Sequence, residues 1–178
     1  MKVLILHLIY FSLLSLDPAE SKKKTKKFPV SGTVTSTINY CGGARPTAEI
    51  LEQAATPRPI PHKKIYIKQG DVNSFGSKTI LQLTTDSNGN FKAKLPAGKY
   101  LVVDSTKNDL LYYNMLLKTY KSQTTNYEAV DTLCLKEWYM KPNCVFEVTD
   151  KEVNNINVNF HKTCDDIPCS RYRGPFKE

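Results

Sequence analysis

The stretch TTDSNGNFKAKLPAGKY, residues 84–100, decides the fold class that this sequence predicts. From Phe91 to Leu95 apolar and polar residues alternate, which is the period-2 pattern of a half-buried strand. Asn88-Gly89 precedes this run and is typical of a two-residue hairpin turn, because a type I′ turn needs positive φ at both central positions. Residues 96–98 close the next reversal with Pro-Ala-Gly. The stretch therefore predicts strands joined by tight turns.

Strand-like patterns continue outward on both sides of this stretch. Seven candidate strands cover residues 28–35, 63–68, 79–85, 91–95, 100–103, 144–148 and 155–160. Strands of this length with short connections are typical of a sandwich, so the predicted fold class is all-β, a seven-stranded antiparallel β-sandwich with short helical inserts. Residues 47–55 have apolar positions at helical spacing, whereas residues 110–121 fit either a helix or an extra strand.

The central stretch also follows the pattern of a known family. Its Thr-Asp, Gly, Phe, Leu-Pro, Gly and Tyr positions fall on Thr85, Asp86, Gly89, Phe91, Leu95, Pro96, Gly98 and Tyr100. Together with the upstream strand at residues 30–34, this pattern resembles the carboxypeptidase regulatory-like domains, which are transthyretin-like (prealbumin-like) β-sandwiches. The resemblance covers about residues 28–104 and implies a noncatalytic module in which these residues supply turns and core. The insert that contains Cys41, and everything after residue 104, depart from the family pattern.

Two further segments carry a second, weaker resemblance and complete the division of the chain. Residues 40–46 and 167–175 are similar to small exported proteins of Bacteroidetes-type bacteria. We expect the β-sandwich domain to cover residues 28–161. The other expected segments are a signal peptide at 1–21, a basic leader at 22–27, inserts at 39–61 and 105–143, and a cysteine-containing C-terminal tail at 162–178.

The N-terminus predicts export. Met1-Lys2 is followed by an apolar run from residue 3 to residue 16, and Ala19 and Ser21 stand at the −3 and −1 positions of a cleavage site after Ser21. The run is too short to cross a bilayer, which takes about 20 residues. We therefore expect a periplasmic or extracellular protein whose mature chain begins at Lys22.

The charge balance is basic, with 25 Lys+Arg against 17 Asp+Glu and a formal net charge of +8. Five of these charges stand together at the start of the mature chain: Lys22, Lys23, Lys24, Lys26 and Lys27. One interpretation is contact with an anionic surface of the cell envelope, and the other is a solvated arm without a specific partner. No nucleic-acid partner is expected, because an exported protein rarely meets one and no aromatic-plus-basic platform is evident.

Five cysteines remain to be explained, namely Cys41, Cys134, Cys144, Cys164 and Cys169. In an exported protein the default expectation is disulfides, and an odd number leaves one thiol free or paired between chains. Cys164 and Cys169 are five residues apart around a Pro-containing turn, which favours a local bridge between them. Cys134 and Cys144 either close a second loop or provide a partner for Cys41.

The alternative is an exported thiol- or metal-dependent enzyme or metal-binding protein. His161, Cys164 and Cys169 supply one imidazole and two thiolates, to which Cys144 or Cys134 would add a fourth ligand. A thiol enzyme would use Cys41, beside two glycines, with His62 as its base. Neither spacing matches a strong zinc or catalytic motif. The favoured expectation is therefore a noncatalytic module without catalytic residues, metal or cofactor, and with an unknown ligand.

Overall fold

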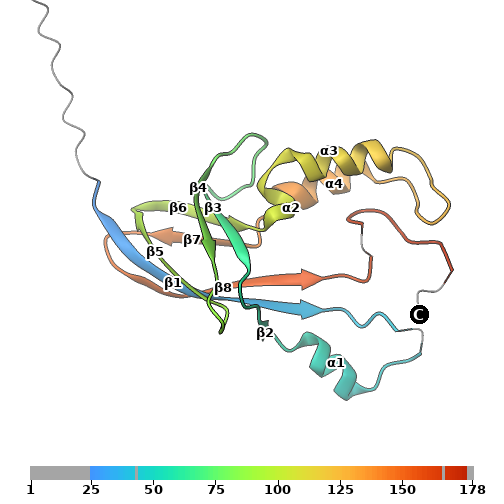
Figure 1. The fold of residues 1–178 in the computed structure, drawn as a ribbon, viewed down its shortest axis with the longest axis horizontal. Coiled ribbons are helices and arrows are strands. Elements are labelled where there is room, and N and C mark those ends of the chain that lie inside the picture. Colours follow the sequence, from blue (N-terminus) through green and yellow to red (C-terminus); the bar gives the residue numbers. More distant parts are fainter. Residues whose placement is uncertain (1–24, 43, 166, 176–178) are drawn as a thin grey trace, which may run out of the picture.

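A computed structural model describes residues 25–42, 44–165 and 167–175 of the chain (Figure 1). The predicted signal peptide and Lys22 to Lys24 of the basic leader lie outside these residues. The elements follow one another as β1 (Lys27–Ile38), α1 (Ala48–Ala55), β2 (Arg58–Pro59), β3 (Lys64–Gln69), β4 (Thr79–Thr84), β5 (Asn90–Pro96), β6 (Gly98–Val103), α2 (Ser105–Asn108), α3 (Leu110–Thr119), α4 (Thr132–Met140), β7 (Cys144–Val148) and β8 (Val153–Lys162).

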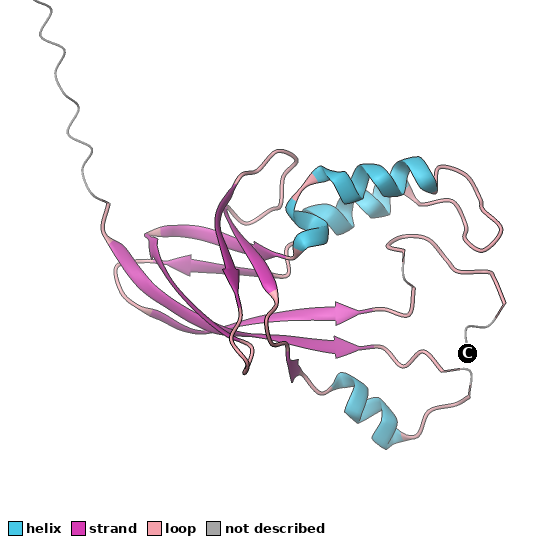
Figure 2. Cartoon of the chain, in the orientation of Figure 1, coloured by secondary structure: helices cyan, strands magenta, loops and turns pink. Residues whose placement is uncertain are grey.

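The strands form two sheets that pack face to face (Figure 2). In the first sheet β1 is central and pairs with the other three strands: β8 lies along one side, and β5 and β2 pair with successive parts of β1. The second sheet has the order β4-β3-β6-β7. The predicted β-sandwich with short helices is thus confirmed, with a two-residue β2 beside the seven predicted strands. One pair differs from the antiparallel rule, because β1 and β8 run parallel, with Val34 opposite Val158.

The core lies where the inward faces of the two sheets meet. Alternation places Val30 and Val34 of β1 there, and Phe91 and Tyr100 from opposite sheets join the same cluster. Other buried members are Ile65, Ile67, Leu95, Val102, Val148, Ile156 and Val158. The Tyr100 hydroxyl donates a hydrogen bond to the Pro96 carbonyl at 2.8 Å. Three residues of the stretch 84–100, Phe91, Leu95 and Tyr100, therefore belong to the core between the sheets.

Asn88-Gly89 does not form the hairpin that the sequence predicts, since β4 and β5 belong to different sheets. Only Gly89 of this pair has positive φ, at 77°. The Asp86 carboxylate accepts the backbone N–H groups of Asn88 and Asn90, which turns the chain from one sheet to the other. A Cβ added to Gly89 would lie 2.9 Å from the Val34 carbonyl oxygen, so this crossing requires glycine.

The first predicted insert, residues 39–61, contains α1 and β2. The second, residues 105–143, contains α2, α3 and α4. Residues 110–121 fitted a helix or a strand, and Leu110–Thr119 of this segment form α3. Each of α2, α3 and α4 begins after an aspartate that caps it: Asp104, Asp109 and Asp131 accept backbone N–H groups of the first turn. Leu116 of α3 and Leu135 of α4 share a small core of their own with Val130. Among the described residues, no helix is long and apolar enough to cross a membrane.

The sandwich strands extend slightly beyond the predicted domain bounds. β1 begins at Lys27 and β8 ends at Lys162, each one residue outside residues 28–161. In Figure 1 the two strands run side by side toward the same end of the molecule, and α3 and α4 lie across from β8 there. The start of β1, where the basic leader joins, is at the opposite end.

Candidate binding cleft

An open cleft of about 860 Å³ lies between the end of β8, the helices α2–α4 and the segment that follows β8. The sandwich contributes its strand ends, the helices contribute one wall, and Thr163, Asp165 and residues 167–169 contribute the other. The charged and aromatic side chains that line the cleft are Lys63, Asp104, Lys107, Tyr112, Trp138, Lys141, Phe160, His161, Lys162 and Asp165.

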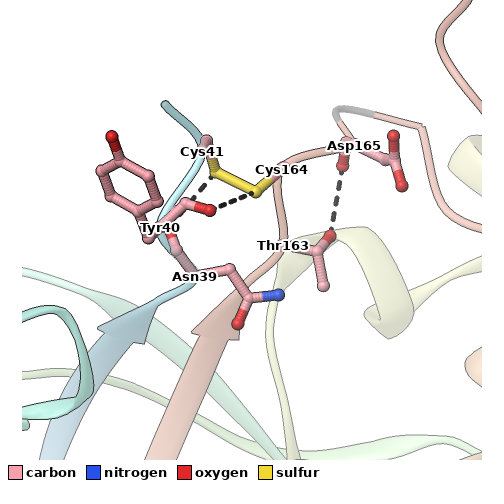
Figure 3. The surroundings of a disulfide bond; sticks show 6 residues. All are labelled: Asn39, Tyr40, Cys41, Thr163, Cys164 and Asp165. Atoms are coloured by element: carbon pink, nitrogen blue, oxygen red, sulfur yellow. Dashed lines mark hydrogen bonds between the residues drawn. A yellow bond between two sulfur atoms is a disulfide. The ribbon is translucent and has the colours of Figure 1, made fainter. Parts of the chain in front are cut away.

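Two disulfides hold the cleft in shape. Cys41–Cys164 joins the chain just beyond the ends of β1 and β8, with a Cα–Cα distance of 5.3 Å (Figure 3). Cys134–Cys169 joins α4 to the C-terminal tail, with a Cα–Cα distance of 5.7 Å. The segment between Cys164 and Cys169 is therefore attached at one end to the sandwich and at the other to the helices.

The expected local bridge between Cys164 and Cys169 is wrong. Parallel pairing of β1 with β8 sets Ile38 opposite Lys162, and Asn39 N–H bonds the Lys162 carbonyl at 2.9 Å. Cys41 and Cys164 follow these paired ends within three residues, so tertiary structure brings together thiols that are 123 residues apart. Cys144 is the cysteine left unpaired, and burial raises the pKa of its thiol.

The lysine side chains give the cleft a positive balance. Lys63, Lys107, Lys141 and Lys162 face Asp104 and Asp165, for a balance of 4 − 2 = +2 without His161. Lysine and aromatic side chains are interleaved: the Lys63 ammonium lies 4.9 Å from the centre of the Phe160 ring, and Tyr112 lies 6.2 Å from Trp138. Side chains of this kind suit a ligand with negative charge.

Lys107 is the most buried of these charges, with a relative exposure of 8%. Its ammonium donates to the Lys141 carbonyl at 2.9 Å and lies 4.7 Å over the Trp138 ring. Burial lowers the pKa of Lys107 to about 8, an effect that Lys141 strengthens and Asp104 opposes. Asp104 also accepts the backbone N–H groups of Thr106 and Lys107, so one carboxylate both starts α2 and faces the ammonium.

A second buried lysine, on β3, holds α2 in place through hydrogen bonds. Lys68 is fully buried, and its ammonium donates to Asn73 Oδ1 at 2.9 Å and to the Asn108 carbonyl at 2.7 Å. The Asn73 amide in turn donates to the carbonyls of Lys107 and Tyr139, each at 2.9 Å. This network joins β3, α2 and α4, and it thereby positions Lys107 in the wall of the cleft.

We expect Lys107 to contribute a rise in the free energy of unfolding between about pH 8 and pH 9.5, and Lys107→Met to remove this contribution. Above pH 8 the folded Lys107 loses its proton while the unfolded chain keeps it up to about 10.5, so the unfolded state binds more protons. The substitution should lower the slope of the unfolding free energy against pH by up to about 1.4 kcal/mol per pH unit. Urea unfolding across this range measures it. Lys68 contributes in the same direction and the raised pKa of Cys144 in the opposite direction, so the difference between the variant and the native chain measures the share of Lys107.

The residues of the enzyme and metal alternatives do not come together. Cys164 and Cys169 belong to separate disulfides, and His161 Nδ1 pairs with the Thr37 hydroxyl at 2.9 Å. Cys41, proposed as a nucleophile, is itself in a disulfide. Within residues 25–42, 44–165 and 167–175, no group of three His, Cys, Asp or Glu side chains has the arrangement of a metal site.

Lys107, Lys141 and Trp138 were not recognised as site residues from the sequence. The capping pattern Asp104-Ser-Thr would have predicted a helix start there. Nothing local would have shown that Lys107 is buried, because its burial depends on α4 and on the Lys68–Asn73 network.

Comparison with known proteins reveals only distant likenesses. No protein-family model matches the chain, and no curated protein matches its sequence. Two mutants of the shaft pilin SpaA from Lactobacillus rhamnosus GG are 13% and 10% identical, with TM-scores of 0.36 and 0.37, covering 78% and 77% of this chain. The Bacillus anthracis TIE protein is 14% identical, with a TM-score of 0.30, over 76% of this chain and 17% of its own. This chain spans about half the length of the pilin chains, 51% in both cases.

Proposed function

We propose that this chain is an exported, noncatalytic β-sandwich module that binds an anionic partner of the cell envelope in the cleft between β8 and α2–α4. The observation that carries the proposal is the lining of that cleft, where four lysines outnumber two aspartates beside three aromatic rings. Two disulfides brace the surrounding chain, so little ordering would be needed when a ligand binds.

The chemistry of the potential nucleophiles supports a noncatalytic role. Four of the five cysteines are in disulfides. The remaining thiol, Cys144, has its pKa raised by burial, which disfavours the reactive thiolate. His161, the imidazole that lines the cleft, pairs with the Thr37 hydroxyl.

Export is supported by the two disulfides, because such bonds persist in oxidising compartments. We also propose membership of the carboxypeptidase regulatory-like type, on the burial of Phe91, Leu95 and Tyr100 and on the turn at Gly89. The leader forms a separate basic site in this proposal. Lys26 lies over the Phe28 ring at the start of β1, and in Figure 1 this start is at the end of the molecule opposite α3 and α4.

The test is binding of polyglutamate and of polygalacturonate to the mature protein, at about 50 and about 200 mM salt. We expect Lys141→Glu with Lys162→Glu to weaken binding about tenfold, because two exposed charges of the cleft change sign. The matched control is Lys118→Glu with Lys136→Glu. These exposed residues of α3 and α4 give the same change in net charge outside the cleft lining.

The control separates a site from a general effect of charge. It should weaken binding by less than about twofold. Equal losses in both double variants would mean that the polymers respond to net charge alone. If neither polymer binds the native protein, the proposal is contradicted directly.

A further inference from the structure

β8 meets the cleft with its edge. Four successive residues of the strand, from Asn159 to Lys162, line the cleft. Successive side chains of a strand point to opposite faces of the sheet, so a cleft that contacts four in a row reaches both faces of β8 and passes around its edge. On the inner face it also reaches Ser36 of β1. Among the described residues β8 pairs only with β1, which leaves this edge without a neighbouring strand.

The free edge presents backbone groups in strand geometry. The Lys162 carbonyl bonds Asn39 on the β1 side. In a parallel pair the N–H and C=O of one residue point to the same side, and the side alternates from residue to residue. His161, Asn159 and Asn157 therefore direct their backbone groups away from β1. In the part of the chain that the structure describes, no other backbone group bonds to these three.

We infer that the cleft takes an extended acidic segment of a partner protein, which adds as a strand to the free edge of β8. This inference rests on the proposed function and names the class of its ligand. An unpaired edge of regular strand is a template for one more strand, whose backbone supplies the matching donors and acceptors. A saccharide has no such repeating backbone, whereas a peptide matches all three positions.

The positive charge of the cleft predicts acidic side chains on that segment. Lys141 and Lys107 line the wall across from β8, while Lys162 is the last residue of β8 and Lys63 lies over the Phe160 ring of that strand. Glutamate or aspartate side chains on an added strand would face ammonium groups on both sides. The segment would be held in a rigid frame, because the β1 ladder and Cys41–Cys164 fix the position of β8.

The experiment uses amide hydrogen exchange of the mature protein with a capped peptide of alternating valine and glutamate, about seven residues long. In the free protein the amides of Asn157, Asn159 and His161 should exchange fast, while those of Val158 and Phe160 are protected by the β1 ladder. At a peptide concentration ten times its Kd, exchange at the three edge amides should slow about tenfold. Unchanged exchange at these amides with peptide bound would overturn the inference.

Two comparison peptides test the backbone and the charge separately. The same peptide N-methylated at alternate residues cannot form the ladder and should not protect the edge. A valine–lysine peptide should bind much more weakly, because its positive charge has the same sign as that of the cleft. Protection by the valine–lysine peptide equal to that by the valine–glutamate peptide would refute the charge argument.

A pair of variants adds a test on the protein itself. Asn159→Pro removes an outward N–H that makes no bond to β1, whereas Asn159→Ala changes the side chain alone. We expect only the proline variant to lose peptide binding. If Asn159→Pro fails to fold, hydrogen exchange of Asn159→Ala with the N-methylated peptide tests the need for backbone bonds instead, because that peptide cannot form the ladder.

The outcomes separate the inference from the proposed function. Polygalacturonate binding that depends on Lys141 and Lys162, without protection of the β8 edge by the peptide, would reject strand addition and leave the anionic cleft standing. If the protein shows neither the lysine-dependent polygalacturonate binding nor the protection of the β8 edge, the anionic cleft and the strand addition are both rejected.

Discussion

Replacing Cys41 and Cys164 by serine will lower the free energy of unfolding by about 5 kcal/mol, the largest effect that we expect from any change in this chain. The bond closes a loop of 123 residues, and the entropy that a cross-link removes from the unfolded chain grows with the length of that loop. The bond also holds the ends of β1 and β8, which form the longest ladder of the first sheet. Urea unfolding without reductant measures the loss.

Two variants serve as controls for this prediction. Cys134→Ser with Cys169→Ser opens a loop of 35 residues and should cost about 4 kcal/mol. Cys144→Ser, at the unpaired thiol, should cost less than about 1 kcal/mol. A smaller loss for the Cys41–Cys164 pair than for the Cys134–Cys169 pair would show that loop length does not set the stability here.

Phe91→Ala will lower the free energy of unfolding by about 3–5 kcal/mol. Phe91 has a relative exposure of 3%, in the core between the sheets. It lies opposite Gly32 of β1, where an added Cβ would come within 2.1 Å of the Ile156 carbonyl oxygen. The backbone around Gly32 is thus already in close contact with β8. It cannot move in to fill the space left by the ring, so a cavity will remain.

Chemical denaturation of Phe91→Ala beside Lys92→Ala provides the measurement. Lys92 is the next residue of β5 and points to the exposed face, so its truncation should change the stability by less than about 0.5 kcal/mol. A loss below about 1 kcal/mol for Phe91→Ala would be incompatible with a buried ring at this position.

Local sequence patterns account for the strands and their inward faces. The alternation in residues 91–95 and 155–160 depends only on neighbours two positions apart, and in the structure Phe91, Leu95, Ile156 and Val158 are buried as it predicts. The same local signal places the helix at residues 48–55, which begins after a Thr47 cap. These features do not depend on which strand lies next to which.

Pairing was decided only by the tertiary structure. Asn88-Gly89 has the composition of a hairpin, yet the strands beside it belong to different sheets, since Gly89 lies against β1 and Asp86 turns the chain across. The parallel pairing of β1 with β8 joins segments more than 120 residues apart, and no local pattern records such a choice. The disulfide partners, the buried Lys107 and the cleft all follow from that pairing. Their residues come from distant segments, and the free energy that brings these together is that of the shared core.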